Sequence, residues 1–250
     1  MSDTILQVSH LKKYFQKEKF TAVDDVSFEL RQGECLGIVG ESGSGKSTLA
    51  KMIMHLETST NGKIFFNGED ITEAKGRKLR DIYQKMQMIF QLPAESFDPR
   101  CTLGDGVGES LRNRGITKKE TRKMVENLLE KCGLEKEYAD RYPHQVSGGQ
   151  CQRAAIARAF ALNPSVLICD EVTSALDVTV QKHILELLRN LKEQENLSLI
   201  MISHDLALVQ MLCDRILVMK DGKVIEEGMT DEVINHPQTD YTRILIESVL

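Results

Sequence analysis

The sequence lacks any apolar run long enough to span a lipid bilayer, and it lacks an excess of basic residues. Its first residues, Met1 to Thr4, do not show the basic-then-apolar profile of a secretory signal. The 250 residues carry a formal net charge of −5, which argues against a broad nucleic-acid-binding face. We therefore expect a cytoplasmic protein without a nucleic-acid partner, for which any role at a membrane requires partner subunits.

The six cysteines lack the spacing of a metal site, because no two of them form a Cys-x-x-Cys pair. We expect reduced structural thiols and neither zinc nor an iron–sulfur cluster. The sequence also lacks internal repeats and low-complexity stretches. Its 41% apolar and 28% charged residues are typical of a soluble protein with one large α/β domain or two small ones. The cysteines are Cys35, Cys101, Cys132, Cys151, Cys169 and Cys213.

Residues 40–48, GESGSGKST, form a stretch rich in glycine and serine that contains one lysine. It fits the P-loop pattern and lies between an expected buried strand at 35–39 and an expected helix at 49–55. Glycines allow backbone N–H groups to converge on an anion, and the helix dipole adds to the attraction. We expect Lys46 to reach the β- and γ-phosphates and Ser47 to bind Mg²⁺. The alternative, a Gly/Ser-rich linker, does not explain the flanking elements.

The segment before this loop is expected to form strands at 5–8 and 22–30. Between them, the aromatic pair Tyr14 and Phe15 either stacks on a nucleotide base or packs under the strand, and the sequence favours neither. Further along, Asn67-Gly68 predicts a hairpin. Residues 86–91 predict a core strand ending at Gln91, which is either a site residue or a simple strand cap.

Residues 92–163 change character and predict a helical insertion. The stretch 92–108 is rich in turn residues. A capping box formed by Thr117 and Glu120 predicts a helix that stops at Gly133. A second helix is expected from Gln150 to Leu162, ending before Pro164.

A short apolar strand then ends in Asp170 and Glu171, a position with little structural use for two acids. We expect Asp170 to bind Mg²⁺ directly or to hydrogen-bond its ligands, and Glu171 to polarise a water for attack on a γ-phosphate. His204 ends the next expected strand, 197–203, where it can bind the γ-phosphate or orient that water. A helix over 178–194, a helix over 205–213, a hairpin across Asp221-Gly222 and two short helices complete the chain.

The sequence VSGGQ at 146–150 opens a helix with a serine and two glycines, which predicts a second anion cradle. One ATP needs only one cradle, so we expect two chains arranged head to tail, each site combining residues 40–48 of one subunit with Ser147–Gln150 of the other. A simple serine N-cap is the alternative for the motif taken alone.

The complete set of motifs resembles the ATP-binding subunit of ABC transporters over essentially the whole chain. In that family the motifs are the Walker A loop at 40–48, the Q-loop Gln91, the signature VSGGQ, the Walker B strand 166–170 with Glu171, the D-loop 174–177 and the switch histidine His204. The resemblance favours Phe15 over Tyr14 as the base-stacking aromatic. It implies ATP and Mg²⁺ as cofactors and three groups of site residues. The implied catalytic residues are Glu171, His204 and Gln91; the nucleotide-binding residues are Phe15, Gly40, Glu41, Ser42, Gly43, Ser44, Gly45, Lys46, Ser47, Thr48, Ser147, Gly148, Gly149, Gln150 and Asp177; the metal-binding residues are Ser47, Gln91 and Asp170.

The resemblance also implies an α/β P-loop NTPase fold with a mainly parallel sheet, an N-terminal antiparallel β subdomain and an inserted α-helical subdomain. The implied division is a RecA-like core plus β subdomain at 1–91 and 164–250, and a helical subdomain at 92–163. The region from Gln91 to Arg100, at the insertion, is implied to face the permease. The implied partners are a second ATPase subunit, identical or different, two transmembrane permeases and, indirectly, an extracytoplasmic substrate-binding protein. The subunit is then expected on the cytoplasmic face of the membrane.

Several stretches within and around these motifs are similar in sequence to the peptide/nickel importer subgroup, which implies a peptide, nickel or a metal chelate as cargo. The similar stretches are GIVGESGSG at 37–45, Phe90-Gln91-x-Pro93 with Asp98-Pro99-Arg100, and His236-Pro237 with Tyr241-Thr242-Arg243. Four residues depart from the family pattern. Val172 stands where proline is usual, which leaves the turn after Glu171 without a fixed φ. The other departures are Val146, Cys151 and Leu92.

Two other classes compete with a transport ATPase. A soluble ABC-type ATPase of DNA repair or translation usually carries a long coiled-coil insertion or two fused halves, and this sequence has neither. A P-loop kinase or GTPase leaves Ser147–Gln150 unexplained.

Overall fold

The structure is a computed structural model, and it describes residues 3–174 and 176–247 of the chain. It divides into two compact units. One combines Met1–Tyr83 with Leu191–Leu250, and the other is Gln84–Asn190. Among the described residues, no helix has the length and apolar character needed to cross a membrane.

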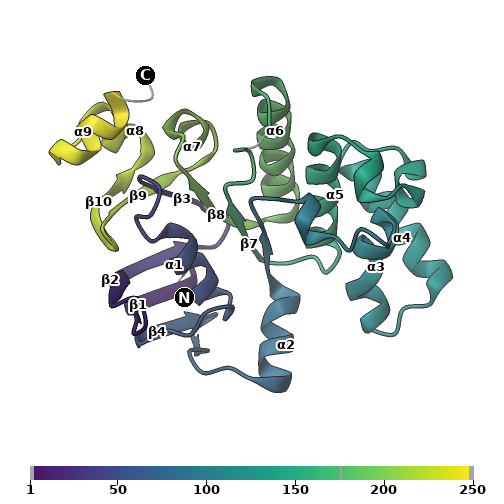
Figure 1. The fold of residues 1–250 in the computed structure, drawn as a ribbon, viewed down its shortest axis with the longest axis horizontal. Coiled ribbons are helices and arrows are strands. Elements are labelled where there is room, and N and C mark those ends of the chain that lie inside the picture. The colour runs from purple at the N-terminus through teal and green to yellow at the C-terminus, as the bar shows by residue number, and fades with distance from the viewer. Residues whose placement is uncertain (1–2, 175, 248–250) are drawn as a thin grey trace. The chain divides into compact units, whose positions relative to one another are not determined.

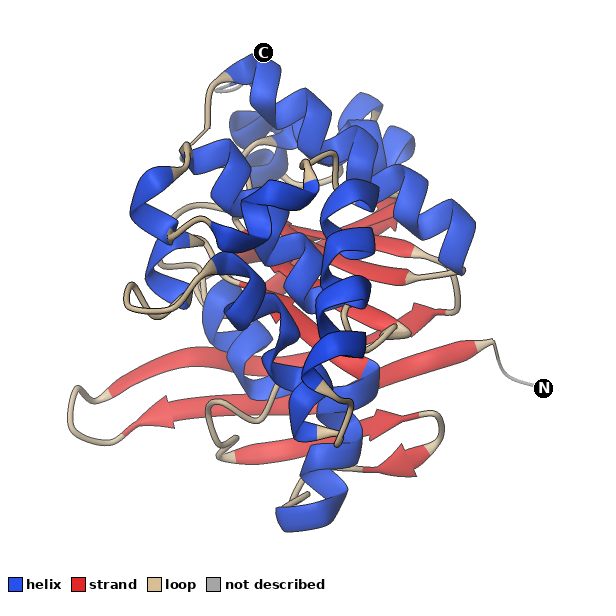
Figure 2. Cartoon of the chain, turned by 90° about the vertical axis from the view of Figure 1, so that its right-hand side faces the viewer, coloured by secondary structure: helices blue, strands red, loops and turns tan. Residues whose placement is uncertain are grey.

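The first unit begins with an antiparallel sheet of strand order β2-β1-β4-β5 (Figure 1). Alternate side chains of β1 and β2, such as Leu6, Val8, Phe28 and Leu30, are buried. This alternation is typical of strands that pack one face against a core. Figure 2 shows the long first strand running out towards the N terminus. The bounds are β1 (Thr4–Phe15), β2 (Phe20–Arg31), β4 (Asn61–Phe66) and β5 (Glu69–Asp70).

A second sheet in the same unit has the order β10-β9-β3-β8. Strand β3 runs parallel to β8 and β9, and β10 returns antiparallel to β9. Every residue of β3 and β8 is buried, as expected for central parallel strands. The turn Asp221-Gly222 takes φ values of 48° and 78°, which suit a tight hairpin. The bounds are β3 (Cys35–Val39), β8 (Ser198–Ser203), β9 (Arg215–Lys220) and β10 (Lys223–Met229).

The helices of the first unit are short. Asp205 caps α7 by accepting the N–H groups of Ala207 and Leu208, and this cap stabilises the start of the helix directly after β8. The charged stretch that begins at Gly76 forms α2, which continues two residues into the second unit. The bounds are α1 (Lys46–Ile53), α2 (Gly76–Lys85), α7 (Leu206–Leu212), α8 (Thr230–Asn235) and α9 (Asp240–Glu247).

The second unit contains a pair of parallel strands and a group of packed helices, α3, α4 and α5 (Figure 1). The capping box of Thr117 and Glu120 is confirmed: the threonine hydroxyl accepts the Glu120 N–H and the glutamate accepts the Thr117 N–H. The bounds are β6 (Met86–Ile89), β7 (Val166–Asp170), α3 (Leu103–Asn113), α4 (Lys118–Lys131), α5 (Gly148–Phe160) and α6 (Val178–Glu195), with 3-10 turns at Ala94–Ser96, Lys136–Asp140 and Pro143–Gln145.

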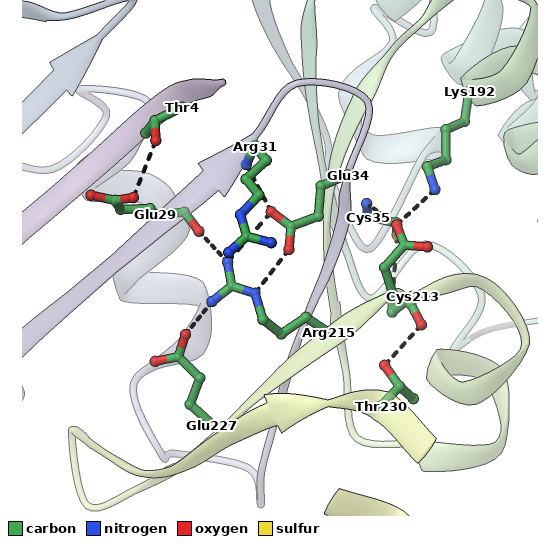
Figure 3. Close-up of polar contacts among 11 residues, drawn as sticks. Thr4, Glu29, Arg31, Glu34, Cys35, Lys192, Cys213, Arg215, Glu227 and Thr230 are labelled. Carbon is green, nitrogen blue, oxygen red and sulfur yellow. Dashed lines mark hydrogen bonds and ion pairs between the residues drawn. The ribbon is translucent and has the colours of Figure 1, made fainter. Parts of the chain in front are cut away.

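An ionic network centred on the buried Glu34 joins the two sheets of the first unit at the amino end of β3 (Figure 3). The Arg215 guanidinium donates to the Glu34 carboxylate at 2.8 Å and also to Glu227 and the Glu29 carbonyl. Burial alone lowers the pKa of Arg215, but the hydrogen bond and charge of Glu34 raise it overall. Nearby, Asp214 accepts the Cys35 N–H and the Lys192 ammonium. These bonds fix the end of the sheet away from residues 40–48.

The expected α/β class, the parallel sheet, the antiparallel N-terminal subdomain and the inserted helices are confirmed. The expected limits of the first two strands were wrong. Residues 12–15 belong to β1, and β2 begins at Phe20. The pairing of β1 with β2 contains irregularities, and His10 and Asp25 take positive φ values of 51° and 60°. Such bulges shift the inward and outward alternation, so the pattern of period two breaks before the strand ends.

Candidate functional site

The 40–48 loop leaves the carboxyl end of β3, where its glycines hold a conformation closed to other residues. Gly40 and Gly45 have φ values of 150° and 101°. A Cβ atom at Gly40 would lie 2.2 Å from the Met219 carbonyl oxygen, and one at Gly45 would lie 2.2 Å from the Ala22 carbonyl oxygen. The loop therefore runs against backbone on both sides, which only glycine permits.

Lys46 occupies the centre of this loop. Its side chain is buried, and its Nζ donates to the carbonyl oxygens of Gly40 and Glu41, each at 2.7 Å, and to Ser44 Oγ at 3.2 Å. Lys46 is also the first residue of α1, whose N-cap, Gly45, supplies no side-chain acceptor. A buried ammonium at a helix N-terminus inside a glycine cradle suits a phosphate chain, to which Nζ can transfer its hydrogen bonds.

His204 follows β8 directly and is exposed. Strands β3 and β8 are paired in parallel with Val39 opposite Ser203. The next residue of each strand, Gly40 and His204, therefore leaves the sheet at the same edge. The first unit thus brings the expected switch histidine to the edge where the phosphate loop begins.

Phe15 is the last residue of β1 and is half-buried. The Lys13 ammonium lies 4.8 Å from the centre of its ring, a cation–π distance, and is fixed by Glu57 at 2.5 Å and the Thr58 carbonyl at 2.7 Å. Tyr14 is more exposed. The structure thus gives Phe15 a cationic neighbour, and stacking of a base on its ring remains our proposal.

In the second unit, the structure brings Gln91 and Glu171 together. They follow the paired parallel strands β6 and β7, in which Ile89 lies opposite Cys169. Gln91 Nε2 donates to Glu171 Oε2 at 2.7 Å and to Ser174 Oγ at 3.4 Å, and Ser174 Oγ donates to the Glu171 carbonyl. The Glu171 backbone has a φ of 50°. This arrangement ties the candidate base to the Q-loop and to the D-loop.

Asp170 ends β7 and is buried, whereas Asp177 is exposed. Asp177 accepts the Val180 N–H at 3.0 Å and so caps α6. Val172, where the family usually has proline, is buried. Ala175, within the expected D-loop, lies outside the described residues.

Ser147 is the N-cap of α5 and forms a capping box with Gln150. The serine Oγ accepts the Gln150 N–H at 3.3 Å, and Gln150 Oε1 accepts the Ser147 N–H at 2.8 Å. The simple capping role is therefore present. Because Oγ is the acceptor in this bond, its proton can still be donated to a phosphate oxygen. Both Ser147 and Gly148 are exposed.

The two signature glycines differ in what surrounds them. A Cβ atom at Gly149 would lie 2.6 Å from Val180 Cγ1 of α6, so this position needs glycine for packing. At Gly148 the nearest atom is Leu176 Cδ2 at 3.7 Å, an ordinary contact. Packing within the chain therefore does not explain the glycine at 148.

Sequence reasoning missed several contacts of these residues. Gln150 Nε2 donates to the Tyr138 hydroxyl at 2.7 Å. The Tyr241 hydroxyl accepts the Glu41 N–H of the phosphate loop at 3.1 Å. The motif around Tyr241 was visible in the sequence, but only as subgroup wording without a role.

Comparison with known proteins identifies the family. Residues 23–174 match the family model described as ABC transporter. The chain is 44% identical over its full length to the oligopeptide transport ATP-binding protein OppF of Bacillus subtilis, covering 83% of that protein, and 42% identical over 98% of its length to OppF of Escherichia coli, covering 77% of it. Its fold matches a dimeric structure of the ATP-binding cassette MJ0796 bound to ADP and Pi, with a TM-score of 0.83, 30% identity and coverage of 90% of this chain and 99% of that one. It also matches cbiO1 of Clostridium perfringens, part of the transporter complex cbiONQ, with a TM-score of 0.83, 29% identity and full coverage of both chains. The chain therefore belongs to the ABC transporter family as an ATP-binding subunit that hydrolyses ATP.

Proposed function

We propose that this subunit powers an importer of oligopeptides. The observation that carries the proposal is the 42–44% identity, over essentially the whole chain, to several proteins named as oligopeptide transport ATP-binding proteins. Two transmembrane permeases and an extracytoplasmic binding protein complete the complex, with this subunit on the cytoplasmic face. Nickel or a metal chelate is the alternative cargo, suggested by the subgroup wording of the phosphate loop.

The catalytic unit is a head-to-tail dimer with a second ATPase subunit. Support comes from the exposed Ser147 and Gly148 at the start of α5 and from a glycine at 148 that packing does not require. In this proposal Ser147–Gln150 of one subunit close over the phosphates held by residues 40–48 of the other. The dimeric state of the MJ0796 cassette supports the pairing of two ATPase subunits.

Within each site, the chain's residues divide the work. Lys46 exchanges its bonds to the Gly40 and Glu41 carbonyls for phosphate oxygens. Glu171 takes a proton from the attacking water, and His204 holds the γ-phosphate. The hydrogen bond from Gln91 Nε2 to Glu171 Oε2 orients this carboxylate for that role.

The donor set also suits Mg²⁺. Hydroxyl, amide and carboxylate oxygens, such as those of Ser47, Gln91 and Asp170, are the ligands that Mg²⁺ prefers in proteins. We propose Ser47, Gln91 and Asp170 as the protein residues that hold it. When bound, Mg²⁺ neutralises charge on the β- and γ-phosphates.

We also propose that residues 92–163 form the helical subdomain that carries the signature motif.

Glu171→Gln, made in the complete transporter reconstituted in vesicles, tests this function. Peptide uptake and ATP hydrolysis should both fall to background, because the amide cannot accept the proton from water. Glu186→Gln, an exposed acid on α6, is the matched control and should retain both activities. Wild-type vesicles that take up Ni²⁺ but no peptide would overturn the peptide cargo. Retained hydrolysis in Glu171→Gln would overturn the role of Glu171.

A further inference from the structure

Tyr241 of the C-terminal helix α9 contacts the phosphate loop through its side chain. The Tyr241 hydroxyl oxygen accepts the backbone N–H of Glu41 at 3.1 Å, across a separation of 200 residues. Glu41 is the second residue of the loop. Tyr241 is not among the residues proposed to bind or hydrolyse ATP, so its contact with the loop indicates a separate role.

The start of α9 is fixed firmly to β10. The buried Glu226 carboxylate accepts the N–H groups of Gln238 at 2.8 Å and Thr239 at 3.1 Å. Thr239 Oγ1 in turn accepts the N–H of Thr242, and the two threonine hydroxyls lie 2.8 Å apart. Hydrogen bonds on both sides of Tyr241 therefore hold the start of α9 in place, and with it the position from which this side chain contacts the loop.

The Tyr241 ring is held from a second direction. The Lys220 ammonium, at the end of β9, lies 4.7 Å from the ring centre. The β9–β10 turn also contacts the loop, because the Gly222 N–H donates to the Ser44 carbonyl at 3.1 Å. The outer side of the phosphate loop is thus fastened to the C-terminal part of the first unit at two points.

The bond from Tyr241 acts on the residue that Lys46 must release. Lys46 Nζ holds the Glu41 carbonyl at 2.7 Å, while Tyr241 holds the Glu41 N–H. When Nζ turns to a phosphate, the carbonyl loses its strongest partner and keeps the Ser44 N–H at 3.2 Å. The tyrosine bond can then keep this part of the backbone in place.

We propose that Tyr241 is a positioning residue for nucleotide binding, which fixes the first turn of the phosphate loop and so sets its affinity for MgATP. The proposal rests on the ATP-binding function of the chain. It assigns to the C-terminal helix a part in substrate affinity and none in the chemical step. Loss of the hydroxyl should therefore raise the Kd and KM for MgATP and leave kcat unchanged.

Tyr241→Phe in the full chain removes only the acceptor oxygen and keeps the ring over Lys220. A net hydrogen bond of ordinary strength predicts a rise of about 2- to 13-fold in the Kd for MgATP. Equilibrium titration of the purified chain measures this Kd, and the assembled transporter gives KM and kcat. Thr242→Val, which loosens the start of α9, should raise the Kd in the same direction.

Tyr83→Phe is the matched control, because the Tyr83 hydroxyl donates to the Met54 carbonyl at 3.1 Å, at the far end of α1 from the loop. This variant should bind MgATP like the wild type, even where its unfolding midpoint falls as far as that of Tyr241→Phe. An unchanged Kd in Tyr241→Phe, or a fall in kcat at constant KM, would overturn the proposal. Failure of the wild-type chain itself to bind MgATP would instead contradict the function on which the proposal rests.

Discussion

Replacing Gly148 by aspartate separates the signature motif's role in the fold from its role in a partner's site. Gly148 is the first residue of α5, it is exposed, and a Cβ atom there meets nothing closer than 3.7 Å. A carboxylate in the first turn interacts favourably with the helix dipole, by about 0.3–1 kcal/mol. The variant should therefore fold at least as well as the wild type, with a Tm higher by roughly 1–4 °C.

The same carboxylate should abolish the composite site. If it lies about 4 Å from a γ-phosphate oxygen at an effective dielectric constant of about 20, the repulsion is about 4 kcal/mol. That energy corresponds to a loss of roughly three orders of magnitude in the rate of ATP hydrolysis.

Steady-state hydrolysis by the assembled transporter measures the loss, and Gly148→Asn is the uncharged control of the same size. We expect the aspartate variant to lose far more activity than the asparagine variant, while both bind MgATP as single chains. Wild-type hydrolysis by Gly148→Asp would refute the placement of this motif over a partner's phosphates.

Three further predictions concern stability and reactivity. Arg215→Met leaves the buried Glu34 carboxylate without its cation, so we expect a loss of about 3–5 kcal/mol in the free energy of unfolding, measured by urea titration. The affinity for MgATP should not change, because this ionic network lies at the end of β3 away from residues 40–48. Burial alone raises the pKa of Glu226, but hydrogen bonds from residues 238, 239 and 242 outweigh it and lower the pKa below its ordinary 4.5. The hydrogen bonds that anchor α9 are therefore fully present above pH 4.5 and weaken as the pH falls through the lower folded pKa. Faster hydrogen exchange in α9 at low pH would reveal this weakening, and Glu226→Gln should abolish the pH dependence. Cys101 is exposed and the other five cysteines are buried, and burial raises the pKa of Cys132 to about 12. One thiol should therefore react with a disulfide reagent in the native chain, and six should react after unfolding. Early labelling of a second thiol would contradict the burial of these cysteines.

Local signals predicted much of the fold, because they act within a few residues. The capping box at Thr117 and the Asp221-Gly222 turn each depend on near neighbours, and each appears as expected. The strand β1 was only partly predicted. Its bulges, marked by the positive φ of His10, break the alternation on which a strand prediction depends.

The site was predictable as a set of motifs but not as a set of contacts. The sequence predicted Gln91 and Glu171 at the ends of separate strands, yet their direct bond depends on side-chain conformations that the sequence does not encode locally. The contact of Tyr241 with Glu41 joins residues 200 positions apart, and no periodic pattern links them. Long-range contacts of this kind become visible only once the sheets are assembled.

The central claim is that residues 40–48 form half of a site, which Ser147–Gln150 of another subunit completes. Hydrolysis of MgATP per chain, measured across dilutions whose oligomeric state is determined by light scattering, tests this claim most directly. We predict that the monomer binds MgATP and hydrolyses it poorly, and that the rate per chain rises as dimers form. Full activity in a demonstrably monomeric sample would contradict the composite site.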